Sequence, residues 1–231
     1  MNILALDTSM GACSAAVLIA DGTTQRIVLC EERMALGHAE ALMPMVAEVM
    51  TEAGLDFAAL DLVAATLGPG SFTGVRIAIA AARGFALATD AHIWGTDSLT
   101  VMAKAALDSG MAGDGKPFAV AVDARGERLY FGLYDADGRK LAGPLLINAG
   151  GAAALLPDEL AAAVGNGAAH VVQAAMLSGH RLEAKLPDLQ PNAAALAELA
   201  LGADETLPTL RPLYLRPPDA KPQAASTVAR R

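Results

Sequence analysis

ILALDTS at residues 3–9 and AVAVDAR at residues 119–125 decide the fold, because each reads as an apolar strand that ends in an aspartate. AATLGPGS at 64–71 and AAAVGNGA at 161–168 form a second matching pair, each an apolar run followed by a glycine-rich loop. The same two features thus recur in the same order, which indicates a duplicated unit. The sequence predicts two related halves that face a cleft.

Within the first half the hydrophobic period changes from that of strands to that of helices. Short runs at 2–7, 13–20 and 25–32 are separated by turns rich in Gly, Ser and Asp, and predict three antiparallel strands. From 37 to 54 the apolar residues recur every three or four positions, which is typical of an amphipathic helix. A strand at 62–66, a helix at 72–88, a strand at 92–95 and a helix at 97–109 are expected to follow.

The glycine-rich break SGMAGDGKP, at 109–117, is the best candidate for a domain boundary. Beyond it the pattern restarts with three strands, a helix near 152–163 and the turn VGNGAA. We therefore assign residues 1–110 to a first lobe and residues 111–216 to a second, reduced lobe. Residues 217–231 have no apolar periodicity and are expected to form a flexible tail.

The bulk composition excludes several classes of protein. Of the 231 residues, 54% are hydrophobic, which can fill a sizeable core, and the net charge of -8 argues against a free-standing nucleic-acid binder. The two cysteines lack paired spacing, so neither a disulfide framework nor a zinc site is expected. The start has no basic flank, and no apolar run reaches the roughly 20 residues of a membrane span. We expect a cytoplasmic protein.

Five motifs stand in order along the chain and carry a resemblance to a known family. They are NILALDTS at 2–9, HAEALMP at 38–44, GPGSFTGVRIAIAAARGFA at 68–86, VDARGERLYFGLY at 122–134 and PLYLR at 212–216. With these motifs the chain resembles the bacterial TsaB (YeaZ) family, in the glycoprotease-like branch of the actin, sugar-kinase and heat-shock ATPase superfamily. The resemblance implies an α/β fold of two actin-like (RNase H-like) lobes, each built as β-β-β-α-β-α, with a cleft between them.

The same resemblance implies an accessory, non-catalytic subunit of the complex that transfers a threonylcarbamoyl group to the adenosine beside the anticodon of tRNA. Its expected partners are a TsaD-like catalytic relative and a TsaE-like ATPase, with tRNA reached indirectly through the complex and a homodimer formed when the chain is alone. The catalytic relative carries two histidines four positions apart, which can reach one metal, whereas His38 here is followed at that spacing by Leu42. We therefore expect no metal and no catalytic residue in this chain.

Two interpretations of the glycine-rich loops stay open. The N–H groups at a helix start and nearby hydroxyls can hold a phosphate, yet the same residue types form ordinary turns and helix caps. We expect no tightly bound cofactor, and residual ATP or ADP binding at the complex interface is the alternative. The residues concerned are Asp7, Thr8, Ser9, Gly68, Gly70, Ser71, Thr73, Gly165 and Gly167.

The first two helices are expected to form the partner surface, as the resemblance implies. Methionines adapt to different partners, and small residues let another helix approach closely. The residues expected there are His38, Leu42, Met45, Val46, Val49, Gly74, Ala78, Ala81 and Ala82.

Two rival functions are kept beside this one. The first is a small-molecule kinase or ATPase of the same superfamily, in which Asp7 and the loop 68–74 bind phosphate. The second is a self-associating scaffold unrelated to tRNA. His170 has no Cys or Asp at ligand spacing and is expected to be structural or solvent-facing. For Asp123, Arg125, Glu127 and Arg128 a charged cluster is one interpretation, and a solvated hairpin with cross-strand pairing is the simpler one.

Overall fold

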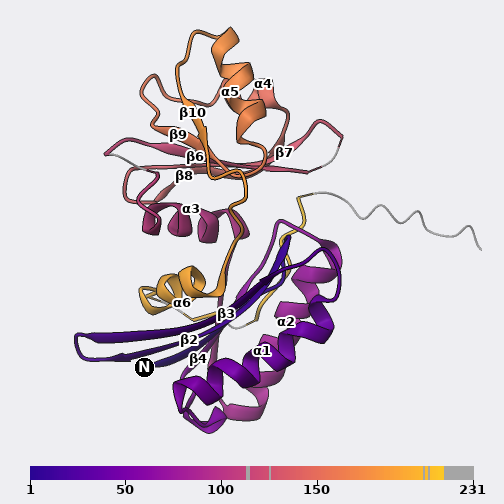
Figure 1. Ribbon diagram of the computed structural model, residues 1–231, viewed down its shortest axis with the longest axis vertical. Helices are drawn as coiled ribbons and strands as arrows, with labels where there is room; N and C mark the ends of the chain where they lie inside the picture. Colours follow the sequence, from indigo (N-terminus) through magenta and orange to yellow (C-terminus); the bar gives the residue numbers. More distant parts are fainter. Residues whose placement is uncertain (113–114, 125, 205, 208, 216–231) are drawn as a thin grey trace, which may run out of the picture.

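The computed structural model describes residues 1–112, 115–124, 126–204, 206–207 and 209–215, so the tail expected at 217–231 lies outside the described residues. Two five-stranded sheets lie one above the other along the longest axis, with helices on their faces (Figure 1). The strand orders β3-β2-β1-β4-β5 and β8-β7-β6-β9-β10 repeat the same connectivity. The predicted duplication in an α/β fold is therefore confirmed.

The central strands of the first sheet are buried on both faces, whereas the edge strand at residues 24–33 is largely exposed. The first three strands of this sheet form an antiparallel meander, and the last two run parallel to the first strand. Because side chains alternate along a strand, Leu4 and Leu6 enter one core while Ile3 and Ala5 enter another. The strands are β1 (Asn2–Asp7), β2 (Ala12–Asp21), β3 (Thr24–Arg33), β4 (Leu62–Thr66) and β5 (His92–Thr96).

Two helices, α1 (His38–Ala53) and α2 (Phe72–Thr89), cover one face of this sheet, and the short turn η1 (Phe57–Ala59) joins α1 to β4. Val46 and Val75 lie in the core between the helices and the sheet. Among the described residues, α2 is the one helix long and apolar enough by composition to cross a membrane. Here it packs its buried residues on a sheet, as the core helix of a globular protein does.

The second unit is smaller than the first. Its strands are β6 (Phe118–Asp123), β7 (Leu129–Tyr134), β8 (Lys140–Ile147), β9 (Ala162–Val164) and β10 (Glu183–Lys185), and its outer helices are α4 (Ala149–Ala153) and α5 (Ala168–Leu177). The helix expected at 152–163 is wrong, because α4 ends at Ala153 and Ala162 already begins a buried strand parallel to β6. Tertiary pairing in the centre of the sheet overrides the helix propensity of alanine.

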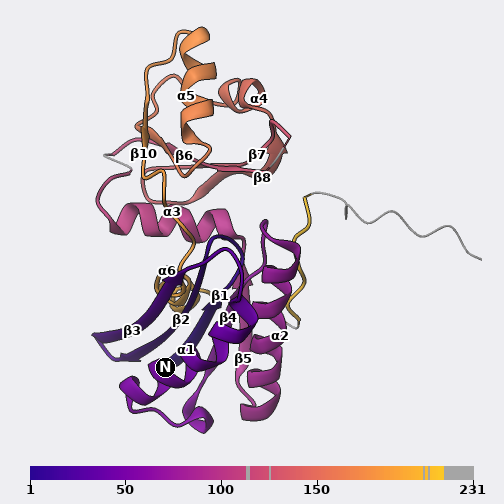
Figure 2. The same ribbon diagram turned by 45° about the vertical axis from the view of Figure 1, so that its right-hand side comes forward.

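Two further helices, α3 (Ser98–Asp108) and α6 (Ala193–Leu201), lie side by side between the sheets (Figures 1 and 2). Lys104 of α3 forms an ion pair with Glu198 of α6. Met102 of α3 packs with the second sheet, whereas Leu196 of α6 packs on the first. Each unit therefore sends its last helix into the layer that faces the other sheet.

The assignment of 111–216 to the second lobe has to be corrected at its end. Besides α6, the segment after it returns to the first lobe: the Leu207 N–H donates to the Ile93 carbonyl at 2.9 Å, and Leu210 is fully buried in the core beneath α1 and α2. The apolar face of α6 has to be buried, and it packs on the face of the first sheet that α1 and α2 leave uncovered.

Two glycines in α2 allow a matched stability test. A Cβ at Gly74 would lie 2.0 Å from the Thr8 carbonyl oxygen, whereas a Cβ at Gly84 meets no atom within 4 Å. We expect Gly74→Ala to lower the free energy of unfolding by about 2–3 kcal/mol through overpacking. Gly84→Ala should raise it by about 0.5–1 kcal/mol, because alanine favours the helix. Urea unfolding of both variants checks this, and equal stability would show that the loop gives way at Gly74.

Candidate functional site

The candidate phosphate loop of the first lobe is closed. Asp7, Thr8 and Ser9 follow β1 and are all fully buried. Asp7 accepts hydrogen bonds from the Ser9 hydroxyl at 2.9 Å, from the Ser9 N–H at 3.2 Å and from the Thr66 hydroxyl. The Thr8 hydroxyl donates to the Gly74 carbonyl at 2.6 Å and accepts from the Ala78 N–H at 3.1 Å. These polar atoms are therefore bonded to the protein itself.

Burial dominates the electrostatics of Asp7. The loss of water around its carboxylate raises its pKa to about 6, although the hydrogen bonds from Thr66 and Ser9 favour the charged form and oppose the shift. The nearby charge of Glu31 raises it slightly further. Asp7 is thus a buried acid that gains a proton more readily than an exposed one.

The loop 67–74 packs against this turn from the other side. The Ser71 N–H donates to the Ser9 carbonyl at 2.7 Å, and a Cβ at Gly70 would lie 2.2 Å from that oxygen. Ser71 caps α2 by accepting from the Gly74 N–H at 3.3 Å, whereas Thr73 is exposed in the first turn. Gly68 has φ +94°, a left-handed conformation that favours glycine. Gly68, Gly70 and Ser71 thus have structural roles in this loop, and Thr73 is exposed.

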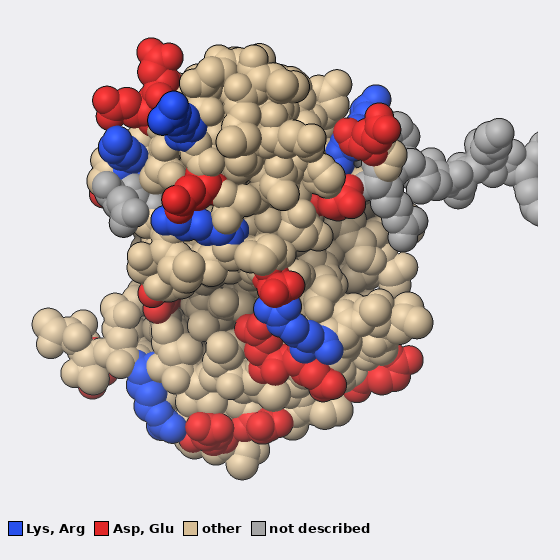
Figure 3. Space-filling model, turned by 45° about the horizontal axis from the view of Figure 1, so that its top comes forward, with Lys and Arg blue, Asp and Glu red and all other residues tan. Residues whose placement is uncertain are grey.

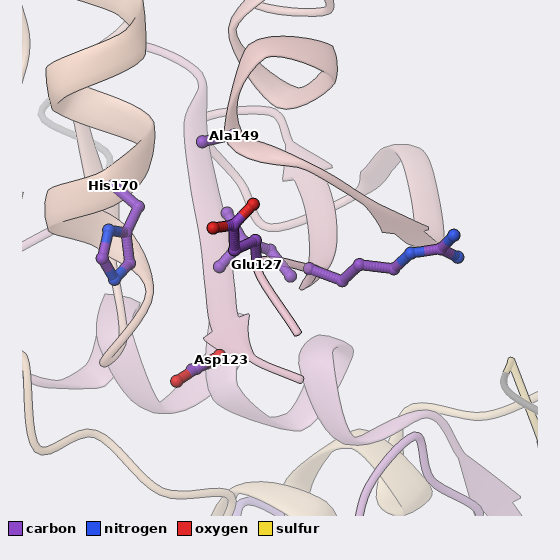
Figure 4. Close-up of a pocket in the computed structure, with 6 residues that line it drawn as sticks. Asp123, Glu127, Ala149 and His170 are labelled. Carbon is purple, nitrogen blue, oxygen red and sulfur yellow. The ribbon is translucent and has the colours of Figure 1, made fainter. Parts of the chain in front are cut away.

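The equivalent position in the second lobe is open. Asp123 ends β6 as Asp7 ends β1, but it is exposed and borders a cavity of about 300 Å³. In Figure 4 the ring of His170 on α5 and the carboxylate of Glu127 lie on either side of the cavity, with Asp123 below and Ala149 above. The cavity is lined by Asp123, Glu127, Arg128, Leu129, Ala149 and His170.

The sequence suggested a charged cluster of Asp123, Glu127 and Arg128 as one interpretation of the hairpin, but it did not bring Ala149 or His170 to it, because these residues come from α4 and α5. Arg125, named with that cluster, lies outside the described residues. The repeat was the available signal, since it aligns Asp123 with Asp7 and places a glycine loop beside each. Gly165 and Gly167 lie against β6: the Gly167 N–H donates to the Ala121 carbonyl at 3.0 Å, and a Cβ at Gly165 would lie 2.4 Å from that oxygen. Their use as nucleotide-binding glycines stays a prediction.

His38 begins α1 and is half-buried, and its Nε2 donates to the Met10 carbonyl at 3.0 Å. Leu42, one turn later, is 1% exposed and belongs to the core. Within the part of the chain that the structure describes, no three His, Cys, Asp or Glu residues are grouped to hold a metal ion.

Most residues expected at the partner surface are in the core instead. They were chosen for apolar periodicity, and that periodicity marks the face that covers the sheet. Ala81 is partly buried and His38 is half-buried, and the exposed face carries other residues, Met43 and Leu87 among them. The residues that must be moved from the surface to the core are Leu42, Met45, Val46, Val49, Gly74, Ala78 and Ala82.

Two sheets with one connectivity, each with an aspartate at the end of its first strand, define a two-lobed protein of the actin-like ATPase class. The model of the family TsaD, tRNA N6-adenosine threonylcarbamoyltransferase, matches residues 31–197. The chain therefore belongs to this family, in the branch that includes the TsaB (YeaZ) proteins.

Individual relatives agree with this assignment. The tRNA threonylcarbamoyladenosine biosynthesis protein TsaB of Escherichia coli is 37% identical over 59% of this chain and 56% of its own length. The chain thus matches about half the length of the named TsaB relatives. An uncharacterized protein of Mycobacterium bovis is 34% identical over 98% of this chain and 97% of its own. The solved structure of YeaZ from Pseudomonas aeruginosa, 31% identical, has a TM-score of 0.76 and covers 93% of this chain and 99% of its own.

Replacing Asp7 tests the electrostatics of the closed loop. The pKa of Asp7 is about 6 in the folded state and 3.8 when exposed, so the folded state binds more protons between these values. The contribution of this titration to the free energy of unfolding is therefore fully present below pH 3.8 and is lost as the pH rises through 6. The whole effect is about 3 kcal/mol.

Asp7→Asn removes this titration, so its free energy of unfolding, measured from pH 4 to 7.5, should fall less with rising pH than that of the wild type. Asp90→Asn, at the exposed C-cap of α2, is the control and should keep the wild-type slope. Identical slopes for wild type and Asp7→Asn would contradict the assignment.

Proposed function

We propose that this chain is an accessory, non-catalytic subunit of a cytoplasmic complex that transfers a threonylcarbamoyl group to tRNA. In this proposal it pairs with a TsaD-like catalytic relative and a TsaE-like ATPase. Membership of the family and the names of the TsaB relatives support the reaction. The closed loop around Asp7 supports the accessory role, because the hydroxyls that would face a phosphate are bonded inside the protein.

The observation that carries the proposal is the exposed face of α1 and α2. Met43 on α1 is 50% exposed, and Phe72 and Leu87, near opposite ends of α2, are 44% and 87% exposed. Exposed apolar side chains on two adjacent helices support an interaction surface there. Arg76 lies over the Phe72 ring at 3.5 Å, an arrangement of aromatic and Arg side chains that is common at binding hot spots.

The sequences of the two helices carry charges of opposite sign, which favours a partner with a related helix pair. Two of these charged side chains also bond within the chain: Glu48 accepts from the Cys30 thiol, and Arg83 donates to the Leu210 carbonyl. The α1 sequence holds Glu40, Glu48 and Glu52 and no Lys or Arg, whereas α2 holds Arg76 and Arg83 and no Asp or Glu. A partner that presents the same two helices across a two-fold axis would place α1 of one chain against α2 of the other. Either the TsaD-like relative or, when that is absent, a second copy of this chain fits this arrangement.

Direct tRNA binding is not part of the proposal. On the face shown in Figure 3, Lys and Arg residues are scattered among Asp and Glu residues, without a broad area of positive charge. A nucleic-acid surface needs such an area to displace counterions from phosphates. In the proposal tRNA is therefore held by the rest of the complex.

Surface substitutions on the two helices test the partner surface. Met43→Arg and Leu87→Arg each place a charge in the expected contact without entering the core. We expect either to weaken binding to the organism's own TsaD-like protein at least about tenfold, or ~1.4 kcal/mol, in titration calorimetry.

Met176→Arg is the matched control, because Met176 is 65% exposed on α5 in the other lobe. It should bind as the wild type does, and circular dichroism confirms the fold of all three variants. If folded Met43→Arg and Leu87→Arg bind like the control, the contact lies elsewhere and the assignment fails.

The rival function, a kinase or ATPase, is tested on the isolated chain. We expect phosphate release from ATP and Mg²⁺ to match a buffer blank, because Asp7 and its hydroxyl partners are closed off from solvent. Phosphate production by the purified chain is measured, with Asp7→Asn beside it. Turnover by the wild type that Asp7→Asn abolishes would replace the accessory role with a catalytic one.

A further inference from the structure

The start of α3 contacts both lobes within two residues. Ser98 is fully buried, and its N–H donates to the Gly68 carbonyl at 2.9 Å while its hydroxyl donates to the Ser9 hydroxyl at 3.2 Å. These bonds attach it to the closed loop of the first lobe. Asp97, the preceding residue, accepts from Nζ of Lys140 on β8 at 2.5 Å, which attaches it to the second lobe.

Asp97, which pairs with Lys140, belongs to a buried cluster of polar side chains that also includes Thr100 and Tyr134. Asp97 also caps α3, because its carboxylate accepts from the Thr100 N–H at 3.0 Å and from the Thr100 hydroxyl at 2.8 Å. That hydroxyl lies 3.4 Å from the hydroxyl of buried Tyr134 on β7. The side chain of Asp97 is 5% exposed and that of Lys140 is 34% exposed, so water and salt screen this pair less than an exposed one.

Two other polar contacts between the lobes are also buried or partly buried: the Ala193 N–H donates to the Ser14 hydroxyl at 2.9 Å, and the side chains of the Lys104–Glu198 pair are 26% and 34% exposed. The remaining ones are more exposed. Arg33 on β3 donates to the Asp188 carbonyl at 2.8 Å and pairs with its carboxylate at 3.9 Å, with both side chains more than 60% exposed. The Gly11 N–H donates to the Gln190 side chain at 2.8 Å. Exposed pairs of this kind contribute little. The apolar contacts that α3 and α6 make with both sheets hold the lobes together, but such contacts are non-directional and do not by themselves fix the angle between the sheets.

We propose that Asp97, Ser98 and Lys140 form a latch that fixes the angle between the two lobes. Ser98 holds the start of α3 to the first lobe, and the ion pair between Asp97 and Lys140 holds it to the second. The latch makes the chain one rigid body, in contrast to a nucleotide-binding protein whose lobes close on a ligand. It does not depend on the function proposed above.

Distances between spin labels on the two lobes test the latch in the full chain. Labels are placed at the exposed positions Thr51 on α1 and Met176 on α5, in a Cys30→Ser background. The parent should give one narrow distance distribution. Lys140→Met should broaden this distribution and shift its maximum, because the angle between the lobes is then set by the non-directional apolar contacts of α3 and α6 alone.

Two further variants separate the latch from simple destabilisation. Asp97→Asn combined with Lys140→Met removes both charges while asparagine keeps the cap of α3, so no buried carboxylate is left unpaired. It should give the same broadening. Lys116→Met breaks the exposed pair with Glu159 inside the second lobe and should leave the distribution unchanged. If the double variant keeps the narrow parental distribution, or if Lys116→Met broadens it equally, the latch is refuted.

Discussion

A buried carboxylate, that of Asp7, ends the central strand of the first sheet, and it has no ion pair with the Lys and Arg residues that the structure describes. Asp7 is solvated by the Ser9 hydroxyl and N–H and by the Thr66 hydroxyl, and these donors come from its own turn and from β4. A buried charge of this kind is costly unless its donors are held in place. The loop 67–74 holds them, because its glycines let the backbone of Thr8 and Ser9 approach within distances that no side chain would allow.

The duplication makes the role of this cluster visible. The two units share one strand order and one aspartate position, yet the first closes its loop with hydroxyls while the second leaves a cavity beside Asp123. A site that is closed by internal hydrogen bonds can give up ligand binding and still position a helix. In the first lobe that helix is α2, whose first turns bond to Thr8 and Ser9. The closed loop thus fixes the start of α2, one of the two helices in the proposed partner surface.

The lobes depend on each other through α3 and α6. Each of these helices buries residues against the sheet of the other unit, and Lys104 and Glu198 pair between them. The segment after α6 also completes the core under α1 and α2 with Leu210. Neither lobe therefore has a complete core without residues from the other, which favours one cooperative molecule over two independent domains.

The sequence by itself determined the local structure of the first unit and the duplication. Alternating and 3.6-residue periods are local properties, so the strands of the meander and helices α1 and α2 were found to within about two residues. The family followed from short motifs whose spacing needs no tertiary information.

Only the tertiary structure decided where each apolar face points. Ala162–Val164 is a strand because it pairs with β6 in the middle of a sheet, against the preference of alanine. Leu42 and Val46 are core residues and Met43 is a surface residue, a distinction that depends on which side of α1 the sheet lies. Asp7 is buried because a loop some sixty residues away closes over it. These outcomes depend on contacts between distant segments, which local propensity cannot encode.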